Sequence, residues 1–280
     1  MRRLQVLTII LVLGALPQLA EAQGQGRPKN PQASSGSDGS GSSTVSTSQF
    51  RQFGVWLDDA TTRAAGGGSF GLGAGYFRGG GASLVDIPII DGSFAVHDRL
   101  QLGMSIPYYR SEVSGTTLRG VDDMYFSGKV VLIDPAIQDA RWGIAVIPVL
   151  EVLSAGFFED RVHWALPISA ELRASPIRVY GSTGYFSRGA VFGAGAIEWA
   201  SAQGTSLTFS LTHAKPTADE ATGLPGGRSD FSVAVGHPVN DATSVYIGVG
   251  RTLSSPDEAN KTSLAISGGI SFSFSAKRNP

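Results

Sequence analysis

Residues 263–274 read Ser-Leu-Ala-Ile-Ser-Gly-Gly-Ile-Ser-Phe-Ser-Phe, so large apolar residues alternate with small ones and only Gly268 interrupts the pattern. A strand places successive side chains on opposite faces, so this period of two gives one apolar face and one small, polar face. The polar face carries almost nothing that could fill a soluble core. The apolar face therefore predicts a barrel strand whose outer side contacts lipid.

The same alternation recurs in eleven earlier segments, which are separated by turns. Most are long enough to cross the hydrocarbon core as tilted strands, whereas strands of soluble proteins average about 5–6 residues. Single-chain bacterial barrels have an even number of strands. We therefore predict an all-β fold, a closed antiparallel transmembrane β-barrel of about 12 strands, over residues 69–78, 84–96, 99–110, 121–132, 142–153, 162–173, 177–187, 190–200, 205–214, 229–238, 243–252 and 262–275.

The two faces agree from strand to strand. Leu207, Phe209 and Leu211 share one face of their strand, while Ser206, Thr208 and Ser210 share the other. Polar side chains on the inner face of a closed sheet need hydrogen-bond partners, either water or one another. A hydrated lumen supplies the water. A soluble exported barrel or sandwich is the alternative, and it would need an apolar interior. The segment 84–96 fits less well because it contains Asp86, Pro88 and Asp91, and we expect a kink or bulge there.

The first 68 residues divide into three parts. Residues 1–22 have a basic start, an apolar stretch and the small-x-small site Ala20-Glu21-Ala22, which predicts a cleaved signal peptide. Residues 23–48 are rich in Gly, Ser and Gln, so we expect a disordered periplasmic tail. The barrel domain is assigned to 49–280, with a lead-in over 49–68. This lead-in either approaches the barrel from outside, which is the favoured interpretation, or is tucked inside it.

Composition and connection lengths fit an exported barrel. The chain has 22 basic and 23 acidic residues and no cysteine, which argues against nucleic-acid binding and excludes disulfides. No segment is apolar over a length that spans a membrane as a helix. Short turns are expected at the periplasmic end, and longer polar loops at the other end over Ser111–Gly120, Lys215–Gly227 and Ser254–Lys261. The expected location is the bacterial outer membrane.

Two runs of sequence resemble a known family. Asp98-Arg99-Leu100-Gln101-Leu102-Gly103-Met104-Ser105-Ile106-Pro107-Tyr108, followed by Gly120-Val121-Asp122-Asp123-Met124-Tyr125-Phe126-Ser127-Gly128-Lys129-Val130-Val131-Leu132, is similar to motifs of the "MetA-pathway of phenol degradation" barrels and the neighbouring hydrocarbon-transporter barrels. Val121 to Asp123 replaces the usual Gly-Asp pair. The resemblance implies an outer-membrane protein that passes small hydrophobic or aromatic molecules, and it transfers no catalytic residue.

Charged residues on the predicted strands must face the lumen, because Lys or Arg exposed to lipid at mid-depth costs about 2–4 kcal/mol. One hypothesis is a charged constriction that selects solutes. The other is that these charges pair across the lumen and hold the barrel closed. The candidate residues are Asp123 near one rim, Lys129, Glu151, Glu171, Arg173, Arg178 and Glu198.

An enzyme is the least favoured alternative. The four histidines, at positions 97, 163, 213 and 237, lie near predicted strand ends with no nucleophile signature beside them. We expect no catalytic site, no metal site and no cofactor, and modest loops weaken a purely adhesive role. The expected partners are outer-membrane lipid, a small solute, and the barrel-assembly machinery, which would bind the C-terminal strand through Leu264, Ile266, Ile270, Phe272 and Phe274.

Overall fold

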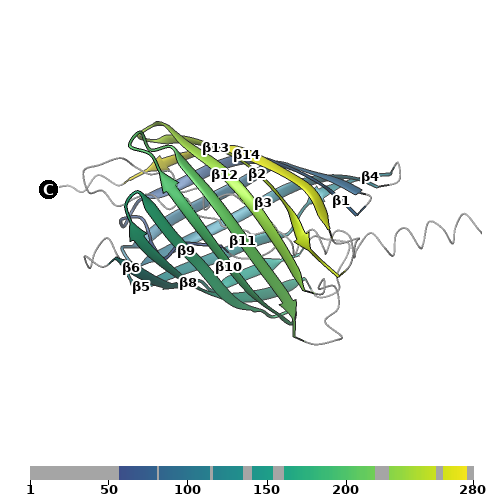
Figure 1. Cartoon of the computed structure of the whole chain (residues 1–280), viewed down its shortest axis with the longest axis horizontal. Helices are drawn as coiled ribbons and strands as arrows, with labels where there is room; N and C mark the ends of the chain where they lie inside the picture. The colour runs from purple at the N-terminus through teal and green to yellow at the C-terminus, as the bar shows by residue number, and fades with distance from the viewer. Residues whose placement is uncertain are drawn as a thin grey trace, which may run out of the picture.

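The computed structural model describes residues 57–80, 82–113, 116–134, 141–153, 161–217, 227–256 and 261–275. The described strands form one antiparallel sheet, which closes because β1 pairs with β14, Gly68 opposite Phe274. Figure 1 shows the resulting barrel with its tilted strands. The strands are β1 Gly68–Gly79, β2 Ala82–His97, β3 Leu100–Val113, β4 Thr116–Val121, β5 Met124–Ile133, β6 Trp142–Val146, β7 Val149–Val152, β8 Val162–Ala174, β9 Ile177–Phe186, β10 Ala190–Ala200, β11 Ser206–Pro216, β12 Arg228–Asn240, β13 Thr243–Ser254 and β14 Thr262–Phe274.

These segments make twelve wall strands in the described chain. β4 and β5 both pair with β3, so they are two parts of one strand broken at Asp122 and Asp123. β6 and β7 both pair with β5 and β8, and the break between them contains Pro148, which has no N–H to donate to the ladder. The predicted closed antiparallel barrel of about twelve strands is confirmed.

One predicted loop is mostly strand. Residues 111–120 were expected as a polar loop, but β3 continues to Val113 and β4 begins at Thr116. β4 pairs with β3 alone, so the two form a hairpin that extends beyond the closed wall at one end of the barrel (Figure 1). The threonines at 116 and 117 favour strand, which explains why polar composition alone misassigned this part.

The expected irregularity in β2 is present. Its pairing register with β3 shifts between Asp86 and Ile89, around Pro88. Before the shift the inward positions are even-numbered and after it they are odd-numbered, so Asp86 and Asp91 are both buried on the inner face. Without the extra residue one of these carboxylates would face lipid, and the bulge therefore keeps the outer surface free of charge at this level.

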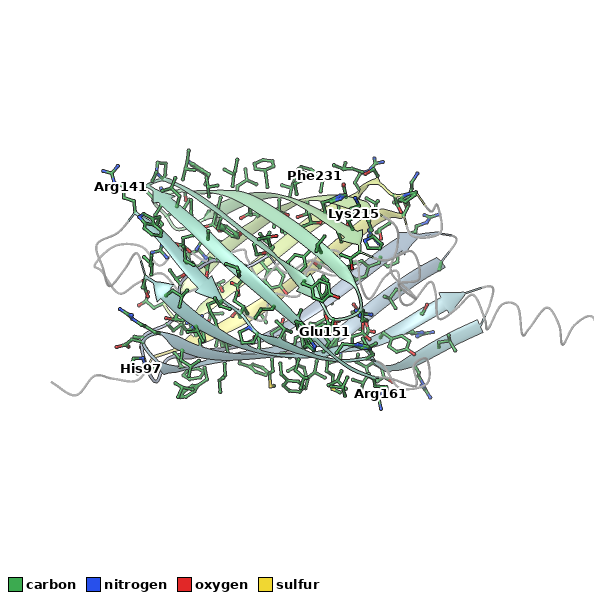
Figure 2. The ribbon with its side chains drawn as sticks, turned by 90° about the horizontal axis from the view of Figure 1, so that it is seen from below. His97, Arg141, Glu151, Arg161, Lys215 and Phe231 are labelled. Carbon is green, nitrogen blue, oxygen red and sulfur yellow. The ribbon has the colours of Figure 1, made fainter. Side chains whose placement is uncertain are left out.

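Apolar side chains cover the outer surface, as the strand alternation predicts. Leu102, Trp164, Leu211 and Ile247 are each 50% exposed or more, and Figure 2 shows side chains projecting outward along the barrel wall. An apolar exterior of this extent is unstable in water and fits a lipid surround. Within the described residues, no helix has the length and apolar character needed to cross a membrane.

Two ends of the barrel are distinguished by their connections. One end, here called the turn end, carries the short connections after β2, β8 and β12 and the start of β1. The opposite end, the loop end, carries the β11–β12 and β13–β14 connections. The predicted signal peptide and the tail over 23–48 lie outside the described residues.

Candidate functional site

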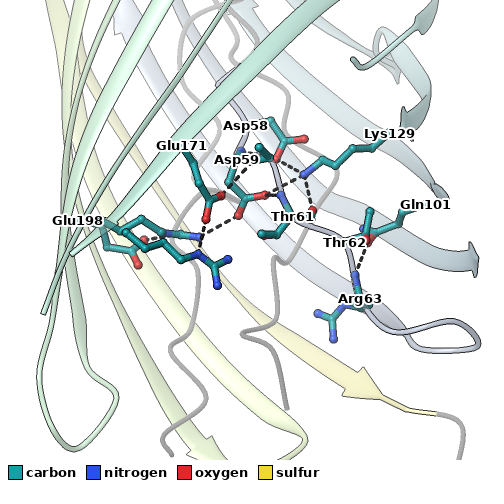
Figure 3. A network of polar contacts seen from close by, with 12 residues as sticks. Asp58, Asp59, Thr61, Thr62, Arg63, Gln101, Lys129, Glu171 and Glu198 are labelled. Atoms are coloured by element: carbon teal, nitrogen blue, oxygen red, sulfur yellow. Dashed lines mark hydrogen bonds and ion pairs between the residues drawn. The ribbon is translucent and has the colours of Figure 1, made fainter. Parts of the chain in front are cut away.

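Residues Leu57–Arg63 lie inside the barrel, in its turn-end half, and we call them the lumen segment. Asp58 and Asp59 are 0% exposed, although both carry carboxylates, and each contacts a side chain of the barrel wall. Figure 3 shows the segment surrounded by polar side chains from several strands. This differs from the favoured prediction of a lead-in outside the barrel. The described part of the lead-in is tucked inside the lumen.

The segment is anchored at its C-terminal end by backbone contacts. Ala65 N donates to Asp98 Oδ1 at 2.8 Å, and Gly66 N donates to Ala95 O at 2.8 Å. Gly66 has a φ of 79°, a left-handed conformation that glycine adopts without strain, and Gly67 N closes the turn onto Ala64 O. Residues 64–67 therefore fix the point at which the segment turns from the lumen into β1.

Lys129 of β5 is the wall residue most closely engaged with the segment. Its Nζ donates to Asp58 Oδ1 at 2.8 Å, to Asp59 Oδ1 at 2.9 Å and to the Thr61 carbonyl at 3.0 Å. The side chain is 0% exposed. An ammonium group has three donors, so these contacts satisfy it completely.

The carboxylate of Asp59 joins two walls of the barrel. Its Oδ1 accepts from Lys129 on β5, while its Oδ2 accepts from Arg178 Nη1 on β9 at 2.9 Å. Arg178 also donates to Glu198 Oε2 on β10 at 2.9 Å, and its guanidinium lies 4.8 Å from the ring centroid of Tyr180. One side chain of the segment thus ties β5 to the β9–β10 side of the lumen.

Wall residues also bind the backbone of the segment. Glu171 Oε2 on β8 accepts from Ala60 N at 3.0 Å, and Glu171 Oε1 pairs with Arg173. Gln101 Oε1 on β3 accepts from Arg63 N at 3.0 Å. Among the described residues, the buried apolar clusters that join the segment to the wall are those of Leu57, with Tyr180 and Ala196, and of Ala60, with Val131 and Ala145.

Burial shifts the ionisation of two groups on the segment. Removal of the Asp58 carboxylate from water raises its pKa from 3.8 to about 7, and the attraction of Lys129 offsets only part of this rise. Burial lowers the pKa of the Arg63 guanidinium to about 10. Arg63 therefore stays charged at neutral pH, whereas Asp58 gains or loses its proton near pH 7.

All seven residues predicted to face the lumen lie on the inner side of the wall, but they form two groups. Lys129, Glu171, Arg173, Arg178 and Glu198 meet in the network around the segment. The other two lie in the loop-end half, where Glu151 Oε2 is 3.5 Å from Arg188 Nη2, and Asp123 accepts from Tyr125 OH at 3.3 Å.

Several inward charges were not predicted from the strand pattern. Asp58, Asp59 and Arg63 precede the first strand, where no alternation marks an inner face. Arg228 and Asp230 do lie on a strand, and their alternation could have identified them as an inner pair. Arg228 Nε is 2.9 Å from Asp230 Oδ1, which also accepts from Thr252 at 2.7 Å.

Apolar side chains line part of the inner wall in the loop-end half. They come from the loop-end portions of β5, β7, β8, β9 and β10, with Ile147 from the break between β6 and β7, and pack together across these strands. The rings of Phe186 and Phe192 lie 4.7 Å apart between centroids. We call this group the inner apolar cluster; its buried members are Tyr125, Ile147, Val149, Ala165, Phe186, Ala190 and Phe192.

The described site offers no arrangement for metal binding, since no group of three or more His, Cys, Asp or Glu side chains is placed to hold an ion there. His97, His213 and His237 are exposed, and His163 is partly exposed. What the lumen does present is a set of paired charges around the lumen segment, with an apolar stretch of inner wall toward the loop end.

Comparison with known proteins relates the chain to others through its fold. No family model and no curated protein sequence matches it. Among solved structures, the COG4313 outer membrane channel from Pseudomonas putida F1 is similar with a TM-score of 0.57 at 13% identity, over 77% of this chain and 98% of that one. The NanC porin gives 0.53 at 9% identity, over 72% and 98%. A KdgM porin gives 0.50 at 12% identity, over 73% and 99%.

These similarities show a fold that the chain shares with outer-membrane channels and porins. Together with the apolar exterior, that fold agrees with the predicted place in the bacterial outer membrane. The more specific resemblance to the MetA-pathway barrels stays a prediction from the sequence motifs, because no family model matches the chain.

Proposed function

We propose that the protein is an outer-membrane channel that passes small molecules without covalent chemistry, and that the lumen segment closes it in the state described. The observation that carries the proposal is the position of the segment. A closed barrel of twelve strands has room for chain inside, and here the only described chain in the lumen is held to the wall by side-chain contacts and two small apolar contacts.

The cargo is proposed to be hydrophobic or aromatic. The motif resemblance to the MetA-pathway and hydrocarbon-transporter barrels supports this class, and so does the inner apolar cluster. Aromatic side chains such as Phe186 and Phe192 bind apolar rings through both area and ring geometry.

Planar-bilayer recording tests the channel proposal and the cargo class together. Discrete conductance steps are expected from protein whose gel band shifts on boiling, the sign of a folded barrel. Phenol should reduce the current more than cyclohexanol does, and F192S should remove the difference. F231S, on the outer face of β12, is the matched control. Conductance with equal effects of the two solutes in wild type would refute the aromatic cargo.

A closed structural barrel is the second candidate function. The complete burial of Asp58, Asp59 and Lys129 favours it, since water reaches none of these charged groups. A permanently closed barrel would give a shifted gel band and no conductance under any voltage, pH or segment substitution. Conductance in any segment variant with the wild-type band shift would exclude it.

A further inference from the structure

We infer that Lys129 and Arg178 form a binding site for a carboxylate-bearing small molecule, and that Asp58 and Asp59 occupy this site as an internal substitute while the lumen is closed. The inference rests on the proposed channel function, because a solute would reach the site through the lumen. It assigns the site a ligand class that neither the fold nor the sequence motifs supply.

Lys129 depends entirely on the lumen segment for its partners. Within the described structure, every hydrogen bond from its Nζ ends on residues 58–61, and its two ion pairs are with Asp58 and Asp59. A buried ammonium is stable only when it is paired and hydrogen-bonded. Once the segment leaves, Lys129 presents an unpaired positive charge to whatever enters the lumen.

Other inward cations have acidic partners outside the segment. Arg173 pairs with Glu171, and Arg228 with Asp230, in each case within one strand. Arg188 pairs with Glu151 in the loop-end half. Their charges stay compensated when the segment moves, so the strongest remaining attraction for an anion lies at Lys129.

The geometry at Asp59 shows how a solute carboxylate would bind. Its two oxygens contact the two cations separately, Oδ1 at 2.9 Å from Lys129 Nζ and Oδ2 at 2.9 Å from Arg178 Nη1. Any carboxylate carries two oxygens with the same separation, and charge-assisted contacts of this kind are the stronger hydrogen bonds in proteins. The site is therefore shaped for one carboxylate between two cations.

The surface beside this site is apolar. Leu57 packs against Tyr180 and Ala196, so its departure uncovers an aromatic ring and a methyl group next to Arg178. A ligand with a carboxylate and an apolar body would replace both Asp59 and Leu57. An aromatic monocarboxylate of the size of benzoate is the simplest member of this class.

Displacement would exchange mainly polar contacts of the segment for polar contacts with the solute. The described apolar contacts of the segment are those of Leu57 and Ala60, and the backbone contacts that fix its turn into β1 lie beyond it at residues 64–67. Residues 57–61 can therefore leave the lumen while the turn at Gly66 stays in place. Competition between the solute and Asp58-Asp59 would couple ligand binding to opening.

The test uses the full chain with D58N and D59N, which removes the internal carboxylates. Benzoate is the probe and benzamide, which has the same shape without the charge, is the matched control. Calorimetry measures binding and planar-bilayer recording measures current block, both on samples with the wild-type band shift. We expect benzoate to bind D58N/D59N at least tenfold more tightly than it binds wild type, and benzamide to bind neither protein measurably.

Adding K129Q to D58N/D59N should weaken benzoate binding at least tenfold, while adding K215Q, an exposed lysine near the loop end, should not. Equal benzoate affinity with and without Lys129 would overturn the binding site, even if the variants conduct. Lys129-dependent binding in calorimetry without any conductance would support the site and refute the channel proposal. The two proposals can therefore fail separately.

Discussion

Lys129 is the residue through which the wall holds the lumen segment most directly. Its ammonium pairs with two adjacent aspartates that are themselves fully buried. Removing one member of a buried ion pair costs about 3–5 kcal/mol, because the remaining charge keeps its desolvation penalty and loses its attraction. The closed state is therefore sensitive to this one side chain, although a buried pair adds little net stability compared with apolar packing.

Replacement of Lys129 by methionine should release the segment. The loss of the lysine's attraction corresponds to an increase of about 10² to 4 × 10³-fold in the population with the segment undocked. The chain has no cysteine, so A60C provides a single thiol at a fully buried position. Maleimide labelling of A60C should accelerate by that factor in K129M and stay unchanged in the control K215M. Slow labelling in K129M would show that other contacts hold the segment.

Asp58 makes docking of the segment dependent on pH. Its pKa is about 7 when docked and near 3.8 when the segment is released into water, so the docked form holds the extra proton between these values. Protonation of Asp58 therefore stabilises the docked form. This contribution to the free energy of docking is fully present below about pH 4 and is lost as the pH rises through about 7. The charged groups around Asp58 come from the lumen segment and from the strands that surround it. They are Asp59, Arg63, Lys129, Glu171, Arg178 and Glu198.

The expected result is a channel whose open probability rises between pH 5 and pH 8. D58N carries no titrating group at this position, so its open probability should be nearly constant over the same range. Single-channel recording at fixed voltage measures both proteins. An open probability that falls with rising pH, or the same rise in D58N, would contradict the assignment to Asp58.

At the scale of elements, the period-two alternation predicted the strands because it is a local property. Each of the twelve expected segments has a counterpart in the wall. The inner position of Lys129 and Glu171 follows from taking every second residue along their strands. The lumen segment could not be predicted in this way. Asp58 and Lys129 are 71 residues apart, and the segment has no periodicity to mark a buried face. Its contacts exist only once the barrel has closed around it.

The strand faces make a direct prediction on β13. Ile247 is 59% exposed on the outer face, and its neighbour Tyr246 lies on the inner face, against Gly73 and Gly269. A lysine on the lipid side near mid-depth costs about 2–4 kcal/mol. I247K should therefore lower the free energy of unfolding in liposomes by that amount, whereas Y246K places its charge in the lumen and should cost less. Urea titration followed by the band shift measures both.

If the two lysines had equal effects, the assignment of inner and outer faces would be wrong. I247L is the control for I247K, because it keeps an apolar residue of equal size against lipid. The cost of a charge exposed to lipid also explains the bulge in β2, where an extra residue keeps Asp86 and Asp91 on the inner side. In β2, charge placement therefore accounts for the irregularity as well as for the strand face.

At the scale of the whole molecule, the barrel separates two environments inside one wall. The turn-end half holds the segment and its charges, while the loop-end half carries the inner apolar cluster. The seam between β1 and β14 closes the wall, and its outer face includes Phe272 and Phe274. Binding of this strand by the barrel-assembly machinery stays a prediction. The channel function proposed above requires that the segment is what blocks the lumen.

The most direct test locks the segment in place without changing its charges. Ala60 and Ala145 lie with Val131 in one buried cluster, so cysteines at both positions are designed to form one disulfide between the segment and the wall in a chain that has no other cysteine. Mass spectrometry verifies the bond, and single-channel recording compares the oxidised and reduced states of A60C/A145C. We predict no conductance steps when the bond is formed and discrete steps after reduction. Equal conductance in the two states would contradict closure of the lumen by residues 57–63.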